Sequence, residues 1–517
     1  MLGRTRHIHF VGIGGIGMSG IAELLANLGY MVTGSDEKRS VVTDRLAAMG
    51  IRLSIGHDAR NIGNGDTADV VVVSSAVRPS NPEVVEATRR QIPVIPRAEM
   101  LAELMRLRFA IAVAGAHGKT TTTSMIALVL ERAGLDPTAV IGGRLSAFGS
   151  NARLGRGELM VAEADESDRS FLKLFPAIAV ITNIDYEHLE NYGSFDDLRQ
   201  AFVDFANKVP FYGAVVACGD DPNLAEVLPR MTRRVTTYGL ESANADITAT
   251  DVQLMAMSVT ATVKRRERRH GPHVRPALPP SPALPSPSAH PAPPASLAPP
   301  APRALPAGSL ATLGQLTLNV PGRHNLQNAL AAVAVGQELG LPFERVAEGL
   351  RAFRGAERRF EVHGEHNGIL VVDDYGHHPT EIAAVLATAR TMNRRRIIVA
   401  FQPHRFTRTA QLMNAFGPAL APADHLVLTD IYAAGEDPIP GITLGTLVQA
   451  IRRDVRGPIE VVPVLDDVVT AVAHTARPGD VVITLGAGSI GTLPERLVEA
   501  LQAAGGRLPP QHEGQRT

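Results

Sequence analysis

The 517-residue sequence contains one cysteine and no tryptophan. A single cysteine, Cys218, excludes a disulfide bond within the chain and is typical of proteins in a reducing compartment. We find no apolar run of the roughly 18 residues that a membrane-spanning helix needs, and no signal-peptide pattern at the N-terminus. Neither sign of charge is in excess, because the formal net charge is −1 and the pI is about 7.0. These absences give no support to nucleic-acid or membrane partners and predict a cytoplasmic protein.

The overall composition is that of a globular protein. Hydrophobic residues make up 45% of the chain and charged residues 20%, which provides ample apolar material for a core. A domain holds roughly 150 residues on average, so this length predicts about three domains. Composition does not distinguish a monomer from a homodimer, and both remain open.

The most informative stretch runs from Ile111 to Thr123 and reads IAVAGAHGKTTTT. The apolar residues 110–113 predict a buried strand, and apolar periodicity predicts a helix from about Thr121 to Ala133. Between them lies a glycine loop whose backbone N–H groups, together with the helix N-terminus, favour phosphate binding. Lys119 can reach the β- and γ-phosphates of a nucleotide, and the Thr120 hydroxyl can ligate Mg²⁺.

This loop departs from the usual phosphate-binding pattern at one position. Val113 stands where the pattern has its first glycine, and Gly115 is the first glycine here. An ordinary glycine turn before a helix is the alternative interpretation. We favour a nucleotide site because strand, glycine loop, Lys-Thr pair and helix occur in the required order. The predicted ATP-binding residues of the loop are Gly115, Ala116, His117, Gly118, Lys119, Thr120 and Thr121.

A second glycine motif follows the predicted strand His7–Val11 and opens a predicted helix, Met18–Leu28. Asp36 follows the next predicted strand, Met31–Gly34, where a dinucleotide-binding fold would hold a ribose. The motif is compatible with NAD and with the diphosphate of a different nucleotide. Its glycines have the spacing G-x-G-x-x-G and are Gly12, Gly14, Gly15 and Gly17.

Ser74 and Ser75 lie at the end of another predicted strand, Asp69–Ser74. Ligands of open α/β sheets bind beyond the carboxyl ends of the strands, so these serines are expected in the same crevice as the glycine motif. Capping of the next turn is the alternative role.

Two further loops carry candidate metal ligands. The predicted strand Glu158–Ala162 leads into an acidic cluster that begins at Glu163, and the predicted strand Ala177–Asn183 leads into a loop that contains His188. Beside a phosphate loop, hard carboxylate oxygens favour Mg²⁺. Solvated surface loops are the alternative, and for His188 taken alone they are the better interpretation.

Residues 264–308 differ in composition from the rest of the chain. A basic run, Lys264–Arg269, precedes a segment dominated by Pro, Ala and Ser, which cannot form a regular ladder or helix. We expect an insertion that is dispensable for chemistry, and nucleic-acid binding by the basic run is the less favoured alternative. Order is expected to resume near Pro321, where Asn325 and Asn328 open a predicted helix at positions typical of caps.

The C-terminal part is predicted to present two polar loops at strand ends. A hairpin turns at Asn367-Gly368, and its second strand, Ile369–Val372, leads into the loop 373–381. The predicted strand Ile397–Phe401 leads into the loop 402–409. Together the two loops are rich in His, Arg and Asp, which favours an anionic ligand because the arginines of loop 402–409 can bind a carboxylate or phosphate through two hydrogen bonds. Plain surface loops are the alternative.

Together these motifs resemble the bacterial Mur ligases across essentially the whole chain. HFVGIGGIGMSG, AGAHGKTTTT, EADESD, TNIDYEHL, GRHNLQNALAA, DDYGHHPTE and FQPHRFTRT occur in the order expected of that family. The resemblance implies an α/β fold of three domains. These are a Rossmann-like UDP-substrate domain (1–105), a central P-loop ATPase-type domain (106–345, with the insertion 264–308) and a Rossmann-like C-terminal domain (346–517).

The resemblance also implies an activity, namely ATP-dependent ligation through an acyl phosphate with Mg²⁺ as cofactor. The implied substrates are ATP, UDP-N-acetylmuramate and L-alanine. Residues implied in UDP-substrate binding are Gly12, Gly14, Gly15, Gly17, Met18, Asp36, Ser74 and Ser75. Thr120, Glu163 and His188 would serve Mg²⁺, and Lys119, Asn325 or Asn328, Arg359 and Asp374 would bind ATP. Tyr375, His377, His404, Arg405 and Arg408 would surround the lactyl carboxylate and the amino acid.

Three other functions fit parts of the sequence. One is a Mur-type ligase that adds another amino acid or a recycled peptide. A second is an NAD-dependent oxidoreductase built on Gly12–Gly17, which leaves Lys119 and the acidic cluster unexplained. A third is a regulatory protein that binds ATP without forming a bond.

Overall fold

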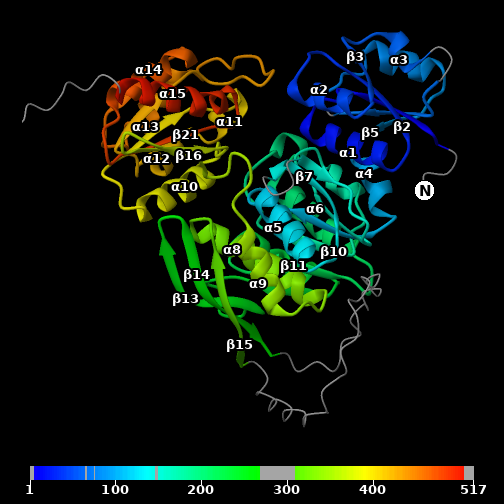
Figure 1. Ribbon diagram of the computed structural model, residues 1–517, viewed down its shortest axis with the longest axis horizontal. Helices are drawn as coiled ribbons and strands as arrows, with labels where there is room; N and C mark the ends of the chain where they lie inside the picture. The colour runs from blue at the N-terminus through cyan, green and yellow to red at the C-terminus, as the bar shows by residue number, and fades with distance from the viewer. Residues whose placement is uncertain (1–4, 64–66, 75, 146–149, 268–308, 506–517) are drawn as a thin grey trace, which may run out of the picture. The chain divides into compact units, whose positions relative to one another are not determined.

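The computed structural model describes residues 5–63, 67–74, 76–145, 150–267 and 309–505. These residues form three sheets of mostly parallel strands with helices packed on them (Figure 1). The chain divides into two compact units, which are described separately. Unit 1 comprises residues 1–252, 260–318 and 326–354, and unit 2 comprises residues 253–259, 319–325 and 355–517.

The first sheet of unit 1 is parallel and has the strand order β3-β2-β1-β4-β5. All five residues of β1 are buried, as expected for a central strand with helices on both faces. The strands are β1 (His7–Val11), β2 (Met31–Asp36), β3 (Arg52–Ile55), β4 (Val70–Val73) and β5 (Val94–Pro96). The helices are α1 (Ile16–Asn27), α2 (Val41–Ala48), α3 (Pro82–Arg89) and α4 (Arg97–Met105).

The second sheet of unit 1 has ten strands in the order β15-β14-β13-β12-β11-β10-β6-β9-β7-β8. Its centre, β11-β10-β6-β9, is parallel, and helix α5 packs on it. The strands are β6 (Phe109–Ala114), β7 (Thr138–Leu145), β8 (Ser150–Arg153), β9 (Leu159–Glu163), β10 (Ile178–Ile181), β11 (Ala214–Cys218), β12 (Val235–Tyr238), β13 (Ile247–Met255), β14 (Ser258–Arg266) and β15 (Leu310–Leu318). The helices are α5 (Lys119–Arg132), α6 (Phe195–Asn207), α7 (Pro222–Val227), α8 (Arg323–Glu338) and α9 (Phe343–Ala352).

The predicted insertion joins two neighbouring strands at the edge of this sheet. Residues 264–266 complete β14 rather than beginning the insertion, and residues 268–308 lie outside the described part of the chain. The backbone N–H of Glu267 donates to the carbonyl of Ser309 at 2.9 Å, so the two flanking chain ends are adjacent.

The sheet of unit 2 has the order β16-β17-β21-β18-β19-β20. Only β16 and β17 are antiparallel, and they form the hairpin predicted at Asn367-Gly368, where both residues have positive φ. Separate apolar clusters fill the two faces of the sheet. The strands are β16 (Glu361–His366), β17 (Ile369–Asp374), β18 (Ile397–Phe401), β19 (His425–Leu428), β20 (Ile459–Val461) and β21 (Val481–Leu485). The helices are α10 (Pro379–Thr391), α11 (Phe406–Gln411), α12 (Phe416–Leu420), α13 (Leu444–Ile451), α14 (Leu465–Thr475) and α15 (Leu493–Gly505).

Predicted and observed elements differ mainly at their ends. Helix α1 begins at Ile16 and α5 at Lys119, two residues before the predicted starts, because each glycine loop continues directly into the first helical turn. Helix α9 runs through the residue pair 345/346, where the sequence placed a domain boundary.

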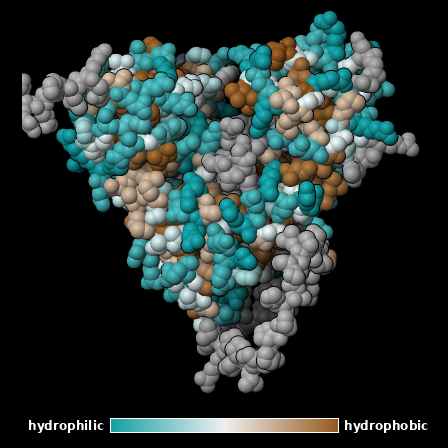
Figure 2. Space-filling view, viewed as in Figure 1, coloured by the Kyte–Doolittle hydropathy of each residue, from teal (hydrophilic) through white to brown (hydrophobic). Residues whose placement is uncertain are grey.

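Within the described residues, no helix is both long and apolar enough to span a membrane. Hydrophilic residues cover most of the surface visible in Figure 2, with hydrophobic residues in small separate groups.

Candidate active site

The phosphate loop joins β6 to α5, and its shape depends on two glycines. Gly115 (φ +133°) and Gly118 (φ +80°) adopt conformations that residues with side chains rarely adopt. A Cβ atom at Gly115 would collide with the hydroxyl of Thr182, and one at Gly118 would lie 2.7 Å from Oδ1 of Asn328. Conformation and space therefore both require these glycines, and Asn328 lies directly against the loop.

The side chain of Lys119 folds back over this loop. Its Nζ donates to the carbonyl of Gly115 at 2.6 Å, to that of Ala116 at 3.2 Å and to Oε1 of Glu166 at 2.8 Å. Burial lowers the pKa of Lys119, but the carboxylates of Glu166 and Asp165 outweigh burial and raise the pKa overall. The ammonium is therefore charged at neutral pH, and a phosphate oxygen would be an acceptor of the same type.

The loop after β10 holds the phosphate loop from the side. Oδ1 of Asn183 accepts the backbone N–H of His117 at 2.8 Å, and the Thr182 hydroxyl donates to the His117 carbonyl at 2.6 Å. Nε2 of His117 lies 2.8 Å from Oδ2 of Asp185. Sequence patterns did not indicate these contacts, because they join residues about 65 positions apart.

Candidate Mg²⁺ ligands lie on three different elements. Glu163 ends β9, Thr120 is in the first turn of α5, and His188 lies in the loop after β10 with Nε2 3.8 Å from Oε2 of Glu187. A Cβ atom at Gly142 would collide with Oε2 of Glu163, so the carboxylate occupies space that this glycine leaves. A carboxylate and a hydroxyl beside a phosphate loop are the hard oxygen donors that Mg²⁺ prefers.

The N-terminal glycine loop is held by the end of β2. The backbone N–H groups of Gly12 and Ile13 donate to the carbonyl of Ser35 at 2.9 and 3.0 Å. The N–H of Gly14 donates to Oδ2 of Asp36 at 2.8 Å. Asp36 therefore fixes the loop itself, a role that the ribose prediction did not include.

The other predicted residues of this loop differ in their surroundings. Ser74 lies beside the loop, because its Oγ would be 3.3 Å from a Cβ atom at Gly12. Ser75 lies outside the described residues. Met18 is 2% exposed, so its side chain belongs to the core, and Gly15 is the N-cap of α1.

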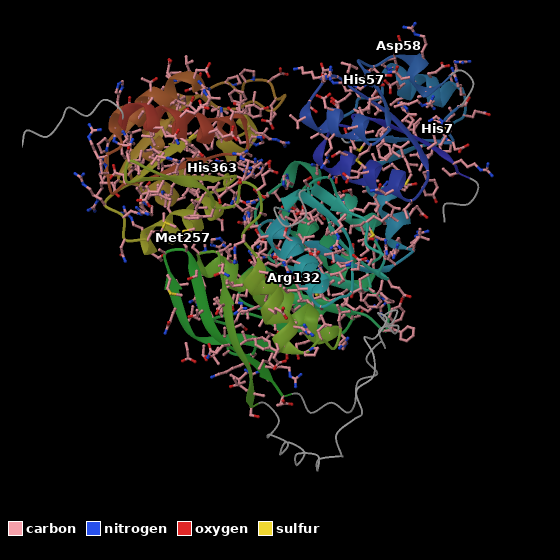
Figure 3. The ribbon with its side chains drawn as sticks, in the orientation of Figure 1. His7, His57, Asp58, Arg132, Met257 and His363 are labelled. Atoms are coloured by element: carbon pink, nitrogen blue, oxygen red, sulfur yellow. The ribbon has the colours of Figure 1, made fainter. Side chains whose placement is uncertain are left out.

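The buried carboxylate of Glu83 forms hydrogen bonds with residues of the first sheet and the loops beside it. Sequence patterns did not identify Glu83. Its Oε2 bonds Nε2 of His9 at 2.9 Å and Oγ of Ser35 at 2.7 Å, and its Oε1 accepts from Asn61 at 2.8 Å. Nδ1 of His57, labelled in Figure 3, lies 3.2 Å from Oε1. Burial raises the pKa of Glu83, but these hydrogen bonds outweigh burial and hold the pKa below its usual value.

A cavity of about 240 Å³ in unit 1 is lined by residues from both glycine motifs. Gly17 and Arg97 come from the carboxyl edge of the first sheet, Lys119 from the phosphate loop, and Glu163 and Asp165 from the acidic cluster. Residues of both glycine motifs therefore line one cavity.

In unit 2, Asp374 ends β17 and is buried. Its carboxylate accepts the backbone N–H groups of Phe360 and Gly376, both at 2.7 Å. Burial raises the pKa of Asp374 to about 6, although the neighbouring Arg359 acts in the opposite direction.

Arg359 connects the same loop to helix α10. Its Nη1 donates to Oε1 of Glu381 at 3.1 Å, and its guanidinium lies 5.2 Å from the ring centroid of Tyr375. His324 lies nearby, and burial together with the charge of Arg359 lowers the pKa of His324 to about 4. Asn325 donates from Nδ2 to the carbonyl of Pro321 at 2.7 Å. This bond is not a helix cap, because a capping side chain accepts a backbone N–H through its oxygen.

The two predicted polar loops of unit 2 come together. The rings of His377 and His404 are 5.5 Å apart, and Nη1 of Arg408 lies 3.1 Å from Nδ1 of His404. Burial and the charges of His377, Arg408 and Arg405 lower the pKa of His404 to about 3, so its imidazole is neutral at pH 7. Arg405 has φ +69°, and its N–H donates to the carbonyl of Tyr432 at 2.8 Å.

Comparison with known proteins agrees with this architecture. Three family models match: "Mur ligase family, catalytic domain" over residues 7–109, "Mur ligase middle domain" over 113–272, and "Mur ligase, glutamate ligase domain" over 358–488. A UDP-N-acetylmuramate–L-alanine ligase of Geobacter sp. (strain M21) is 50% identical over 98% of this chain and 99% of its own. One of Anaeromyxobacter dehalogenans (strain 2CP-C) is 49% identical over 96% and 98%. The crystal structure of a UDP-N-acetylmuramate–alanine ligase from Thermotoga maritima is similar over 97% of this chain and 100% of that chain, with a TM-score of 0.75 and 29% identity.

Proposed function

The chain belongs to the Mur ligase family, and we propose that it joins L-alanine to the lactyl carboxylate of UDP-N-acetylmuramate while ATP is converted to ADP and phosphate. The family and the full-length similarity to L-alanine ligases support the reaction. The structural observation that carries the proposal is the cavity lined by Gly17, in the first turn of α1 after the first glycine loop, and by Lys119, which begins α5 after the phosphate loop. A ligase of this kind needs a UDP-sugar acid and ATP in one space.

The chemistry needs an activated carboxylate, because a carboxylate itself is a poor acyl donor. A lactyl oxygen attacks the γ-phosphorus of ATP, the bond to the ADP oxygen breaks, and an acyl phosphate forms. The amine of L-alanine then attacks the acyl carbon, the bond to phosphate breaks, and the amine loses a proton. Positioning and electrostatics carry most of phosphoryl transfer, and in our proposal Lys119 neutralises the phosphoryl oxygens. On family grounds Arg359 is assigned to a phosphate of ATP.

Mg²⁺ is the implied metal. Thr120, Glu163 and His188 would hold it, and when bound it would neutralise charge on the ATP phosphates. The hard oxygen donors at Thr120 and Glu163, the latter lining the same cavity as Lys119, support this assignment.

In unit 2 we assign the amino acid to the loops that contain His377 and His404. Because the low pKa of His404 leaves it neutral at pH 7, we assign the carboxylate of L-alanine to Arg405 and Arg408 beside it. Asp374 and Asn325 are assigned to ATP on the same family grounds, as is Asn328 of unit 1. We further propose that the protein acts in the cytoplasm as a monomer or homodimer.

The test is phosphate release from ATP with UDP-N-acetylmuramate, in the presence and absence of L-alanine. We expect release only when both are present, and no release when UDP-N-acetylglucosamine replaces the acid. Release with a preformed peptide or another amino acid, but not with L-alanine, would assign the chain to a different ligase of the family. ATP binding without release under any combination would contradict a ligase function.

A further inference from the structure

Arg97 lies at the sheet edge where a nucleotide ligand is expected. It is the first residue of α4 and directly follows β5, at the carboxyl edge of the first sheet. The glycine loop follows β1 at the same edge, with only β4 between the two strands. Ligands of parallel sheets bind beyond this edge, and α4 packs against α1 (Figure 1).

The guanidinium of Arg97 fits a space that Gly17 provides. A Cβ atom at Gly17 would collide with Nη1 of Arg97, so this glycine makes room for the arginine in the first turn of α1. On its other side, Nη2 of Arg97 donates to Oδ2 of Asp165 at 3.1 Å. That bond uses one of the five N–H donors of a guanidinium, and 31% of the side chain remains exposed where it lines the cavity.

We propose that Arg97 binds the diphosphate of the UDP-sugar, taking the phosphate nearer the sugar through two parallel N–H donors. This inference rests on the proposed function. The guanidinium lies beside the first turn of α1, so an anion bound there interacts with the arginine and with the positive end of the helix dipole. The lactyl carboxylate instead belongs at the Lys119 side of the cavity, because it must reach the γ-phosphate.

Asp165 has a positioning role in this arrangement. Its bond to Nη2 holds the arginine side chain beside Gly17 before the substrate arrives. A preorganised guanidinium loses less side-chain entropy on binding, which favours affinity for the UDP-sugar.

The experiment measures binding of two UDP-sugars by isothermal titration, without turnover. UDP-N-acetylmuramate carries both diphosphate and carboxylate, whereas UDP-N-acetylglucosamine carries the diphosphate alone. We expect Arg97→Ala to weaken binding of both by about 10- to 100-fold, the range for hydrogen bonds to a charged group. The affinity of Arg97→Lys should lie between those of the wild type and Arg97→Ala, because lysine keeps the positive charge but cannot donate two parallel hydrogen bonds to one phosphate. Gly17→Ala should weaken both by displacing the guanidinium, and its effect should not add to that of Arg97→Ala.

Arg106→Ala is the matched control, since Arg106 follows α4, is 56% exposed and pairs with Glu103. It should change both affinities by less than about twofold, as expected for an exposed ion pair. In steady state, Arg97→Ala should raise the KM for UDP-N-acetylmuramate and leave the KM for ATP unchanged.

Two outcomes overturn the proposal. If Arg97→Ala weakens the binding of UDP-N-acetylmuramate but not that of UDP-N-acetylglucosamine, the arginine contacts the carboxylate and not the diphosphate. If neither affinity changes while the melting temperature is retained, Arg97 only pairs with Asp165. The proposed function is tested separately, because a wild-type protein that binds both UDP-sugars and releases no phosphate contradicts the ligase assignment alone.

Discussion

The ammonium nitrogen of Lys119 lies 2.8 Å from Oε1 of Glu166, at the phosphate loop. Glu166 is 3% exposed, and its Oε2 has no hydrogen-bond partner among the described residues. The lysine is therefore held in place by a buried carboxylate before any nucleotide binds. A γ-phosphate bound at the loop would compete with Glu166 for the N–H donors of Lys119.

The first prediction concerns that cation. We expect Lys119→Ala to lower phosphate release by at least about 1,000-fold, because the charge that builds on the γ-phosphoryl oxygens loses its positioned ammonium. A coupled phosphate assay with saturating substrates measures the effect. Lys173→Ala is the control, since Lys173 is an exposed lysine paired with Glu99, and it should retain full activity. Retained turnover in Lys119→Ala would remove the loop from the mechanism.

The second prediction concerns the metal. Chelation with EDTA should abolish phosphate release, and added Mg²⁺ should restore it. Glu163→Gln should raise the Mg²⁺ concentration for half-maximal activity by about tenfold or more, because an amide oxygen replaces a charged ligand. Glu158→Gln alters an exposed residue just before the start of the same strand and serves as control. An unchanged Mg²⁺ requirement in Glu163→Gln would place the metal elsewhere.

Local sequence constraints explain which parts of this site could be predicted. The two glycine loops follow from chain geometry, because Gly12, Gly115 and Gly118 need positive φ and the flanking strands are continuous apolar runs. The hairpin at Asn367-Gly368 follows for the same reason. Such features depend on residues close together in the sequence.

Contacts between distant residues could not be predicted in this way. Arg97 meets Asp165 across 68 positions, and Glu83 meets His9 across 74, so no periodicity or spacing connects them. For Asp36, the sequence predicted the position at the sheet edge but not the hydrogen bond that its carboxylate accepts from the N–H of Gly14. A position at a strand end follows from the pattern, whereas the hydrogen-bond partner depends on tertiary packing.

The third prediction concerns acid stability in unit 2. The pKa of His324 is about 4 in the folded chain, against about 6.5 for an unfolded histidine. Below pH 6.5 the unfolded state therefore binds a proton that the folded state does not, and stability falls as pH falls from 6.5 towards 4. The loss at pH 4.5 is about 2.5 kcal/mol from this group.

The test compares melting temperatures between pH 8 and pH 4.5. The wild-type curve should fall more steeply with acid than that of His324→Gln, which lacks the titrating group. His474→Gln removes an exposed histidine of the same unit and should follow the wild type. Parallel curves for wild type and His324→Gln would contradict the low pKa.

The last prediction concerns the insertion between β14 and β15. Because the N–H of Glu267 donates to the carbonyl of Ser309, an Asn-Gly turn in place of residues 268–308 can close the two neighbouring strands. None of the proposed site residues lies on β14 or β15, so we expect kcat and all three KM values to stay within about twofold. The melting temperature should be retained, since a shorter connection lowers the loop-closure entropy. A Gly/Ser segment of the original length is the control, because it keeps the length and removes the composition. Loss of turnover in both variants at an unchanged melting temperature would show that the proline-rich composition itself takes part in catalysis.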